Sequence, residues 1–413
     1  MKVCFETFGC RLNRAEALEE EAKYLARGWE LTDSHEDAQL IVVRGCSVTQ
    51  RAQRDCERLI DHIKRKYPFK RVIITGCLPS ANKSYTIRGL AGVARKPTSA
   101  GGPGVQAPSD VPQRTARAYL KVQDGCNGHC TFCIVPQFRG PSKSEPFDAL
   151  LDKAKRFIEA GYHEIVVTGC NLSMYASGGK RLPELLSAFA ELDPNCRIRL
   201  GSLEPGPIAL DTVHAIAEHE NLCRFLHIPV QSGSERILSA MRRPYRAKDV
   251  DALVREAVRL MPDIGLGCDI LTGFPDEMDN DFLATKALFK RLPFSNAHVF
   301  PYSERPDTFA ATLPNAIPSP IRSARAHEIA DLANVSRNHF VKRFKGRVVE
   351  IVIEDEKNLA GLTSEDRVCH IGAEKTKTLS RYRGATERTI KRKDLVKVLV
   401  REVHEHVLTG DPT

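Results

Sequence analysis

The sequence predicts an α/β protein of three domains: a small parallel α/β domain, a central partial (β/α)6 barrel, and a small antiparallel β-barrel at the C-terminus. Three observations predict this fold class. The chain has 413 residues, which is too many for one ordinary core. Short apolar runs alternate with helical stretches over most of the chain, as in parallel α/β folds. The pattern then changes to closely spaced short strands.

The composition is that of a soluble globular protein, with 42% apolar and 27% charged residues. No apolar run reaches membrane-spanning length, and the opening MKVCFETFGC lacks the pattern of a signal peptide. We therefore expect a cytoplasmic protein with no membrane partner. Thirteen cysteines in such a chain indicate metal binding or catalysis rather than disulfides. The net charge of +9 suits an anionic partner.

The first expected domain, residues 1–93, alternates three strands with two helices. Cys10, Cys46 and Cys77 each come directly after one of the strands. Because the carboxyl ends of neighbouring parallel strands lie side by side, we expect these thiols to converge and form a metal site. The alternative is that they are small core residues, as expected for Cys4 and Cys56. The expected strands are 3–7, 40–44 and 71–75, and the expected helices are 13–26 and 49–66.

Residues 94–117 are rich in Pro, Gly and Ser and predict a linker, whereas residues 118–340 predict an incomplete, TIM-like parallel barrel. Its expected strands are 118–123, 164–168, 197–200, 225–228, 265–271 and 295–300, and its helices are 147–160, 183–192, 208–218, 248–260 and 279–292. Such barrels place their chemistry at the carboxyl ends of the strands. Four polar clusters occupy those ends: Thr168, Gly169 and Asn171; Ser202 and Glu204; Gln231 and Ser232; Tyr302 and Ser303.

Three cysteines, Cys126, Cys130 and Cys133, follow the first barrel strand in the run GCNGHCTFC. Three thiolates can hold a four-iron cluster and leave one iron open to a substrate or cofactor. A structural zinc site would need a fourth ligand. His129 could supply it, but its position beside Cys130 favours an ordinary loop residue. The spacing therefore indicates an iron–sulfur centre with a catalytic role.

The last expected domain, residues 341–405, follows a helix expected at 321–344. Strands expected at 348–353 and 395–403 predict a small β-barrel. A basic tract at residues 391–393 is typical of barrels that bind nucleic acid, although such a run also occurs on solvated surfaces.

The pattern C-x-x-x-C-x-x-C, with an aromatic residue before the last cysteine, resembles the radical S-adenosylmethionine (SAM) enzymes. In that superfamily SAM binds the open iron and is cleaved to a 5′-deoxyadenosyl radical. Over nearly its whole length, the chain also resembles the tRNA-modifying methylthiotransferases of the superfamily. The motifs are ETFGC at 6–10, RGCSVTQRA at 44–52, TGCLPS at 75–80, KVQDGCNGHCTFCIVPQFRGPSKS, VVTGCNLSMY, RLGSLEP, HIPVQSGSERIL, MRRPY, ILTGFPDE and VFPYSERPDT.

The resemblance implies two 4Fe–4S clusters and SAM as cofactors. An auxiliary cluster would belong to the N-terminal methylthiotransferase domain, and the radical SAM cluster to the barrel. The implied ligands are Cys10, Cys46 and Cys77 for the auxiliary cluster and Cys126, Cys130 and Cys133 for the radical SAM cluster. The implied SAM contacts are Glu204 and Gln231, with Thr168, Gly169 and Asn171 along the same rim. Cys170 departs from the family pattern, which commonly has an aliphatic or amide residue there.

The motifs are close to those of the branch that methylthiolates carbon 2 of N6-threonylcarbamoyladenosine, next to the tRNA anticodon. A C-terminal TRAM-like domain would bind the anticodon arm, and the reaction would need a low-potential electron donor, flavodoxin-like or similar, and a sulfur donor. Two alternatives are a methylthiotransferase for isopentenyladenosine in tRNA and one for a ribosomal-protein aspartate. A third, from another class, is a non-catalytic iron–sulfur RNA-binding protein.

Overall fold

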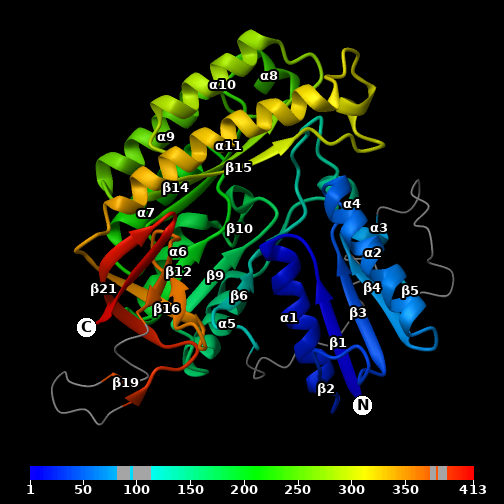
Figure 1. Cartoon of the computed structure of the whole chain (residues 1–413), viewed down its shortest axis with the longest axis vertical. Helices are drawn as coiled ribbons and strands as arrows, with labels where there is room; N and C mark the ends of the chain where they lie inside the picture. Colours follow the sequence, from blue (N-terminus) through cyan, green and yellow to red (C-terminus); the bar gives the residue numbers. More distant parts are fainter. Residues whose placement is uncertain (81–93, 96–112, 373–377, 380–387) are drawn as a thin grey trace.

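The computed structural model describes residues 1–80, 94–95, 113–372, 378–379 and 388–413, and Figure 1 shows how its parts are arranged. The N-terminal part contains β1 (Lys2–Thr7), α1 (Arg11–Leu25), β2 (Glu30–Leu31), β3 (Leu40–Gly45), α2 (Gln50–Lys66), β4 (Arg71–Gly76), α3 (Cys77–Ser80) and β5 (Ala94–Arg95). The strands form a parallel sheet in the order β2-β1-β3-β4-β5. Every residue of the central strand β3 is buried, as expected for a parallel strand that is covered on both faces.

The central part contains six parallel strands with helices outside them (Figure 1). The strands are β6 (Ala118–Lys121), β9 (Glu164–Thr168), β12 (Arg197–Leu200), β13 (Phe225–Gln231), β14 (Gly265–Thr272) and β15 (Asn296–Pro301). The helices are α5 (Phe147–Glu159), α6 (Leu182–Leu192), α7 (Pro207–Glu218), α8 (Glu235–Ala240), α9 (Ala247–Leu260), α10 (Asp279–Arg291) and α11 (Ser319–Lys342). The shorter elements are β7 (Gln123–Asp124), α4 (Val135–Arg139), β8 (Lys143–Ser144), η1 (Leu172–Met174), β10 (Ala176–Ser177), β11 (Lys180–Arg181) and η2 (Phe309–Thr312).

The six central strands form two three-stranded sheets, β12-β9-β6 and β13-β14-β15. Two single parallel bridges, Ile198 to Leu222 and Ser202 to His227, connect the sheets across β12 and β13. The largest hydrophobic core lies between these strands and the surrounding helices. The predicted partial barrel is therefore confirmed, and its six strands divide into two halves.

The C-terminal part is a closed five-stranded barrel in the order β16-β17-β18-β22-β21. Its elements are β16 (Val348–Asp355), β17 (Ala360–Leu362), β18 (Val368–Ile371), β21 (Leu395–His404) and β22 (Val407–Pro412), and a separate hairpin consists of β19 (Thr378–Leu379) and β20 (Arg388–Thr389). The prediction of a small barrel is confirmed, but β18 and β22 pair in parallel rather than antiparallel. An odd number of strands cannot alternate in direction around a closed ring, so one parallel pair is unavoidable.

Buried charges attach this terminal barrel to the amino ends of the central strands. Glu164, the first residue of β9, is fully buried and accepts hydrogen bonds from Arg197 and Arg199 of β12. Arg197 also donates to the carbonyl of Glu350 at 2.8 Å, and Arg199 to that of Thr363 at 2.7 Å. The terminal barrel thus lies at the opposite end of these strands from their carboxyl termini.

The expected elements agree with the observed ones to within a few residues at their ends. The prediction missed several short elements, among them β2, β5, α4, α8, β17 and β18, and it missed β22, which lies beyond the expected end of the last domain at residue 405. The segment predicted as a linker is described only in part. Residues 94–95 form β5 in the N-terminal sheet, while Gln113 and Thr115 are buried against the start of the central part. Residues 96–112 lie outside the described parts. Among the described helices, none has both the length and the apolar composition that a membrane span requires.

Candidate active site between the N-terminal sheet and the central barrel

The first cysteine trio lies at the carboxyl edge of the N-terminal sheet, as predicted. Cys10 caps α1, Cys46 follows β3 and Cys77 opens α3, so the trio follows three adjacent strands. The chain packs tightly there: a Cβ on Gly9 would lie 2.8 Å from the Cβ of Cys46, and Gly9 has a φ of +98°. Burial raises the pKa of the Cys46 thiol to about 12 and raises that of Cys77 as well. Loading a metal cluster must therefore displace protons from these thiols.

The second trio lies on the loop between β7 and α4. The amide of Gly128 donates to the Cys126 Sγ at 3.2 Å, and a Cβ on Gly128 would lie 3.2 Å from this sulfur and 3.9 Å from the Cys130 Sγ. Burial raises the pKa of Cys133 to about 12, and the neighbouring thiols of the trio contribute to the shift. His129 is exposed, consistent with an ordinary loop residue. The loop therefore brings the three thiols close to one another.

Gln123, the first residue of β7, holds this loop in position. Its side-chain amide donates to the carbonyl of Gly125 at 2.7 Å, and its carbonyl oxygen accepts from the amide of Asn171 at 3.0 Å. A Cβ on Gly169 would lie 2.8 Å from the same oxygen. Thr168, the last residue of β9, is buried, and its carbonyl accepts a hydrogen bond from the amide of Val122. Gly169 lies against Gln123, so both residues pack against the segment that leads into the cysteine loop.

Two of the expected SAM contacts lie against the second trio. The Asn171 Nδ2 donates to the Glu204 carboxylate at 2.8 Å, and the Asn171 side chain hydrogen-bonds Cys126. Arg243 pairs with Glu204 at 2.5 Å and donates to the Cys130 Sγ at 2.8 Å. Sequence reasoning missed Arg243, although it lies in the motif MRRPY. Gln231, the remaining expected contact, ends β13 with a φ of +63°, a conformation that is uncommon for a residue other than glycine.

Arg139 connects Cys77 of the first trio to Asp124, which lies two residues before the second trio begins. Its Nε donates to the Cys77 Sγ at 3.3 Å, and its Nη1 donates to Asp124 at 2.9 Å and to Glu16 at 3.1 Å. Arg139 ends the short helix α4, which follows the second trio, whereas Cys77 and Glu16 belong to the N-terminal part. Sequence reasoning missed this residue too, because only the folded chain brings α4 against α1 and α3.

Cys170 lies in the same region. Its thiol is 3.5 Å from the Asp124 carboxylate, and burial raises its pKa, with Arg139 opposing the shift. Asp124 thus contacts both Cys170 and Arg139.

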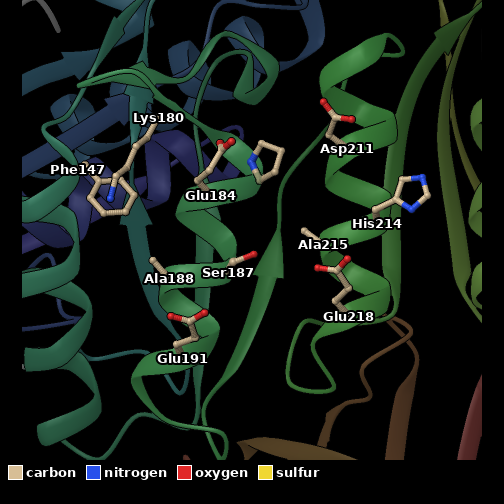
Figure 2. Close-up of a pocket in the computed structure, with 11 residues that line it drawn as sticks. Phe147, Lys180, Glu184, Ser187, Ala188, Glu191, Asp211, His214, Ala215 and Glu218 are labelled. Carbon is tan, nitrogen blue, oxygen red and sulfur yellow. The ribbon is translucent and has the colours of Figure 1, made fainter.

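A surface pocket elsewhere does not belong to this site. Figure 2 shows it between α6 and α7, with Glu184, Asp211, His214 and Glu218 among its lining residues. These helices form the outer layer of the barrel, whereas both cysteine trios follow the carboxyl ends of strands.

Each trio supplies three thiols, which is the donor set that a four-iron cluster with one open iron requires. Gly9 lies against Cys46 of the first trio, and Gly128 lies against Cys126 and Cys130 of the second. Arg139 and Arg243 place positive charge beside Cys77 and Cys130, which favours thiolate ligands.

Comparison with known proteins agrees with this geometry. Residues 120–289 match the family model of the radical SAM superfamily, and residues 2–93 match the uncharacterized protein family UPF0004. Among solved structures, the radical SAM methyltransferase TsrM from Kitasatospora setae, with cobalamin and a [4Fe-4S] cluster bound, superposes with a TM-score of 0.56 at 15% identity. The match covers 75% of this chain and 76% of that one. The fold is thus that of a radical SAM enzyme.

Similar proteins of known function narrow the class of radical SAM enzyme. Threonylcarbamoyladenosine tRNA methylthiotransferase MtaB from Aquifex aeolicus is 30% identical, over 87% of this chain and 94% of the relative. tRNA-2-methylthio-N(6)-dimethylallyladenosine synthase from Chlorobium limicola is 31% identical, over 89% and 91%. The Bacillus subtilis MtaB is 29% identical, over 86% and 85%. The chain belongs to the MiaB-like radical SAM methylthiotransferase family, whose members carry two 4Fe–4S clusters and use SAM.

Proposed function

We propose that this protein methylthiolates carbon 2 of N6-threonylcarbamoyladenosine next to the anticodon of tRNA. The observation that carries the proposal is the packing of Cys77 of the first trio against Ile134 and Phe138, which follow the second trio, with Arg139 linking Cys77 to Asp124. The hydrogen on carbon 2 is too weakly acidic for a side-chain base to remove, so its replacement by sulfur requires a radical. When bound, SAM and the clusters supply that radical and the sulfur.

The side chains around the trios have distinct roles in this proposal. Cys126, Cys130 and Cys133 hold the radical SAM cluster. Asn171 and Glu204 are hydrogen-bonded to each other at 2.8 Å, Arg243 pairs with Glu204, and both residues line the SAM position. Gln231, at the end of β13 in the other half of the barrel, is a further proposed contact.

Cys10, Cys46 and Cys77 hold the auxiliary cluster in the proposal. The guanidinium of Arg139 offsets the charge of the Cys77 thiolate. By also binding Asp124, it holds the two cysteine loops at a set separation.

The terminal barrel is the proposed site for the anticodon arm. Lys391 and Arg392 are exposed and can contact phosphates, so binding should weaken as salt rises. The adenosine would be splayed out of its stack to reach the clusters. The low-potential electron donor, the sulfur donor and the cytoplasmic location stay predictions.

A second candidate substrate is dimethylallyladenosine, because relatives named for that nucleoside are as similar to this chain as those named for threonylcarbamoyladenosine. Mass spectrometry of tRNA nucleosides from a strain lacking the gene separates the two. We expect loss of 2-methylthio-N6-threonylcarbamoyladenosine alone, restored by the wild-type gene. Loss of the dimethylallyl derivative instead would assign the second substrate, and no change in either nucleoside would contradict both.

Iron analysis tests the two cluster sites separately from the substrate. The holoenzyme should hold about eight irons per chain, four in each cluster. The triple variant of Cys10, Cys46 and Cys77 to Ala should hold about half and still release 5′-deoxyadenosine from SAM under reducing, anaerobic conditions. Cys56→Ala is the matched control, because Cys56 is a fully buried thiol of the same domain with no proposed ligand role. An unchanged iron content in the triple variant would show that the first trio is core.

A further inference from the structure

Three ligand-type side chains meet on the inner face of the second half-barrel, away from both cysteine trios. They are His227 of β13, Asp269 of β14 and His298 of β15. Their sequence neighbours Ile228, Cys268 and Ala297 point to the helical side and belong to the main core. Because side chains alternate along a strand, the trio faces the barrel interior.

The strand register brings these three residues together. Asp269 and His298 are directly paired across β14 and β15, and His227 pairs with Gly267, two residues before Asp269. Glycine is required beside His227: a Cβ at position 267 would lie 2.8 Å from the His227 Nδ1. The ring can therefore lean over β14 and turn its Nε2 toward Asp269.

The interatomic distances suit a shared metal ion. The Asp269 Oδ1 is 2.9 Å from the His227 Nε2 and 3.4 Å from the His298 Nδ1, and the ligand atoms all lie within 4.8 Å of one another. Ligands about 2.0–2.1 Å from a tetrahedral zinc ion are about 3.4 Å apart. A separation of 3.4 Å is long for an N–H···O hydrogen bond but ordinary for two ligands of one ion.

The surroundings also favour a cation. The one carboxylate of the trio, that of Asp269, contacts both imidazoles and supplies a negatively charged ligand. Exposure increases along the trio, with side-chain values of 10% for His227, 22% for Asp269 and 57% for His298. The site is therefore buried on the side of β13 and accessible to solvent on the side of the edge strand β15.

The trio is separate from the proposed SAM site. His227 precedes Gln231 by four residues and Asp269 precedes Thr272 by three, which places the trio roughly 10 Å below the strand ends. On the amino-end side of the trio, the loop of the terminal barrel that contains Glu365 packs against the central barrel. A Cβ on Gly265 of β14 would lie 2.6 Å from the Glu365 carbonyl.

We propose that His227, Asp269 and His298 form a binding site for a divalent transition-metal ion of the zinc type. Two imidazoles and one carboxylate are a donor set that such ions accept, and three protein ligands leave a further position for water or a substrate oxygen. This site is additional to the two iron–sulfur clusters and does not depend on which nucleoside the enzyme modifies.

The test uses untagged holoenzyme with both clusters loaded, so that the six ligand cysteines are occupied. The protein is dialysed anaerobically against zinc chloride and then against buffer, and retained zinc is measured by plasma mass spectrometry. Zinc K-edge absorption then separates nitrogen and oxygen ligands near 2.0–2.1 Å from sulfur ligands near 2.3 Å. We expect about one zinc per chain with a nitrogen and oxygen shell that includes imidazole.

Asp269→Asn and His298→Ala should each abolish this uptake. His214→Ala is the matched control, because His214 also faces a carboxylate, Glu256, at 3.3 Å but has no second imidazole beside it. It should leave zinc uptake unchanged. His298 is exposed, so its variant should keep the iron content and circular dichroism of the wild type even if the Asp269 variant folds poorly. No retained zinc, a sulfur shell, or equal uptake by wild type and His298→Ala would overturn the proposal.

Discussion

The guanidinium of Arg139 donates hydrogen bonds to Cys77, Asp124 and Glu16, and so links the N-terminal part to the central part. Its side chain is only 2% exposed, and that of Glu16 only 5%. Glu16 also faces Arg44 and Lys121. Removing one partner from a buried charge group is costly, since the remaining charges lose their compensation.

Glu16→Gln should destabilise the N-terminal part by about 3 kcal/mol, because buried Arg139 and Arg44 each lose one carboxylate partner and keep only Asp124 and Glu20. The measurement is urea unfolding followed by the fluorescence of Trp29, the single tryptophan, which packs on Tyr24 in that part. Asp55→Asn, which removes an exposed ion pair of α2, should change the free energy of unfolding by less than about 0.5 kcal/mol. Equal effects of the two variants would contradict this account.

The Glu16 carboxylate should also make the free energy of unfolding depend on pH. Burial would raise the pKa of Glu16, but Arg139, Arg44 and Lys121 lower it from 4.5 to about 2. The unfolded chain therefore takes up the proton first, so this stabilisation is complete above about pH 4.5 and is lost as pH falls toward 2. It amounts to about 3 kcal/mol. Trp29 fluorescence should show the loss in wild type, and Glu16→Gln should lack this part of the pH dependence.

At the scale of elements, the amino ends of β9 and β12 act as the attachment point of the terminal barrel. Burial would raise the pKa of Glu164, yet Arg199 and Arg197 hold it far below its usual range. The two arginines then use their remaining N–H groups on backbone carbonyls of the terminal barrel, including those of Glu350 and Thr363. One buried carboxylate therefore orients two arginines that contact the terminal barrel.

Glu164→Gln should loosen this attachment, since buried Arg197 would lose its carboxylate partner and Arg199 would keep only Asp366 at 3.3 Å. Hydrogen–deuterium exchange should show amides of β16 to β18 exchanging about tenfold faster or more, while the N-terminal sheet keeps its protection. Glu350→Gln, which alters only the exposed pair with Lys397, is the control and should leave exchange unchanged. Unaltered protection of β16 to β18 in Glu164→Gln would show that apolar packing alone attaches the barrel.

At the scale of the whole molecule, the cysteine trios and the basic tract occupy different ends of the fold. The trios lie where the N-terminal sheet faces the carboxyl ends of the central strands, whereas the terminal barrel covers the amino ends. Within the basic tract, Lys391 and Arg392 are exposed, but the Lys393 ammonium lies 3.6 Å from the centre of the Tyr162 ring. A substrate that reaches both ends must extend along the molecule, as a tRNA arm can.

Lys391→Ala and Arg392→Ala should each weaken binding of tRNA and reduce the slope of log affinity against log salt by about 1, because each removes one phosphate contact. Lys393→Ala is the matched control from the same tract. Its amine packs on Tyr162, so the salt slope should stay at the wild-type value. Filter binding over a range of potassium chloride concentrations measures all three. Identical slopes for all variants would contradict the proposed role of the tract.

Much of the fold was predictable because its signals are local. Apolar periodicity located strands such as 164–168 and 197–200 at their observed bounds. The strand-end cysteines and the C-x-x-x-C-x-x-C spacing identified the two cysteine trios. The contacts of Arg139 and Arg243 were not predictable in this way. Each guanidinium reaches a sulfur far away in the sequence, and which sulfur it reaches depends on how α4 and the loop after α8 pack.

The sequence by itself determined the three-part α/β architecture, the two cysteine trios and the radical SAM methylthiotransferase family, because periodicity and motif spacing are properties of short segments. Only the tertiary structure decided that Arg139 links Cys77 to Asp124, that the terminal barrel lies at the amino ends of the central strands, and that His227, Asp269 and His298 share one face. These features depend on strand order and register, which are set by packing between segments distant in the chain.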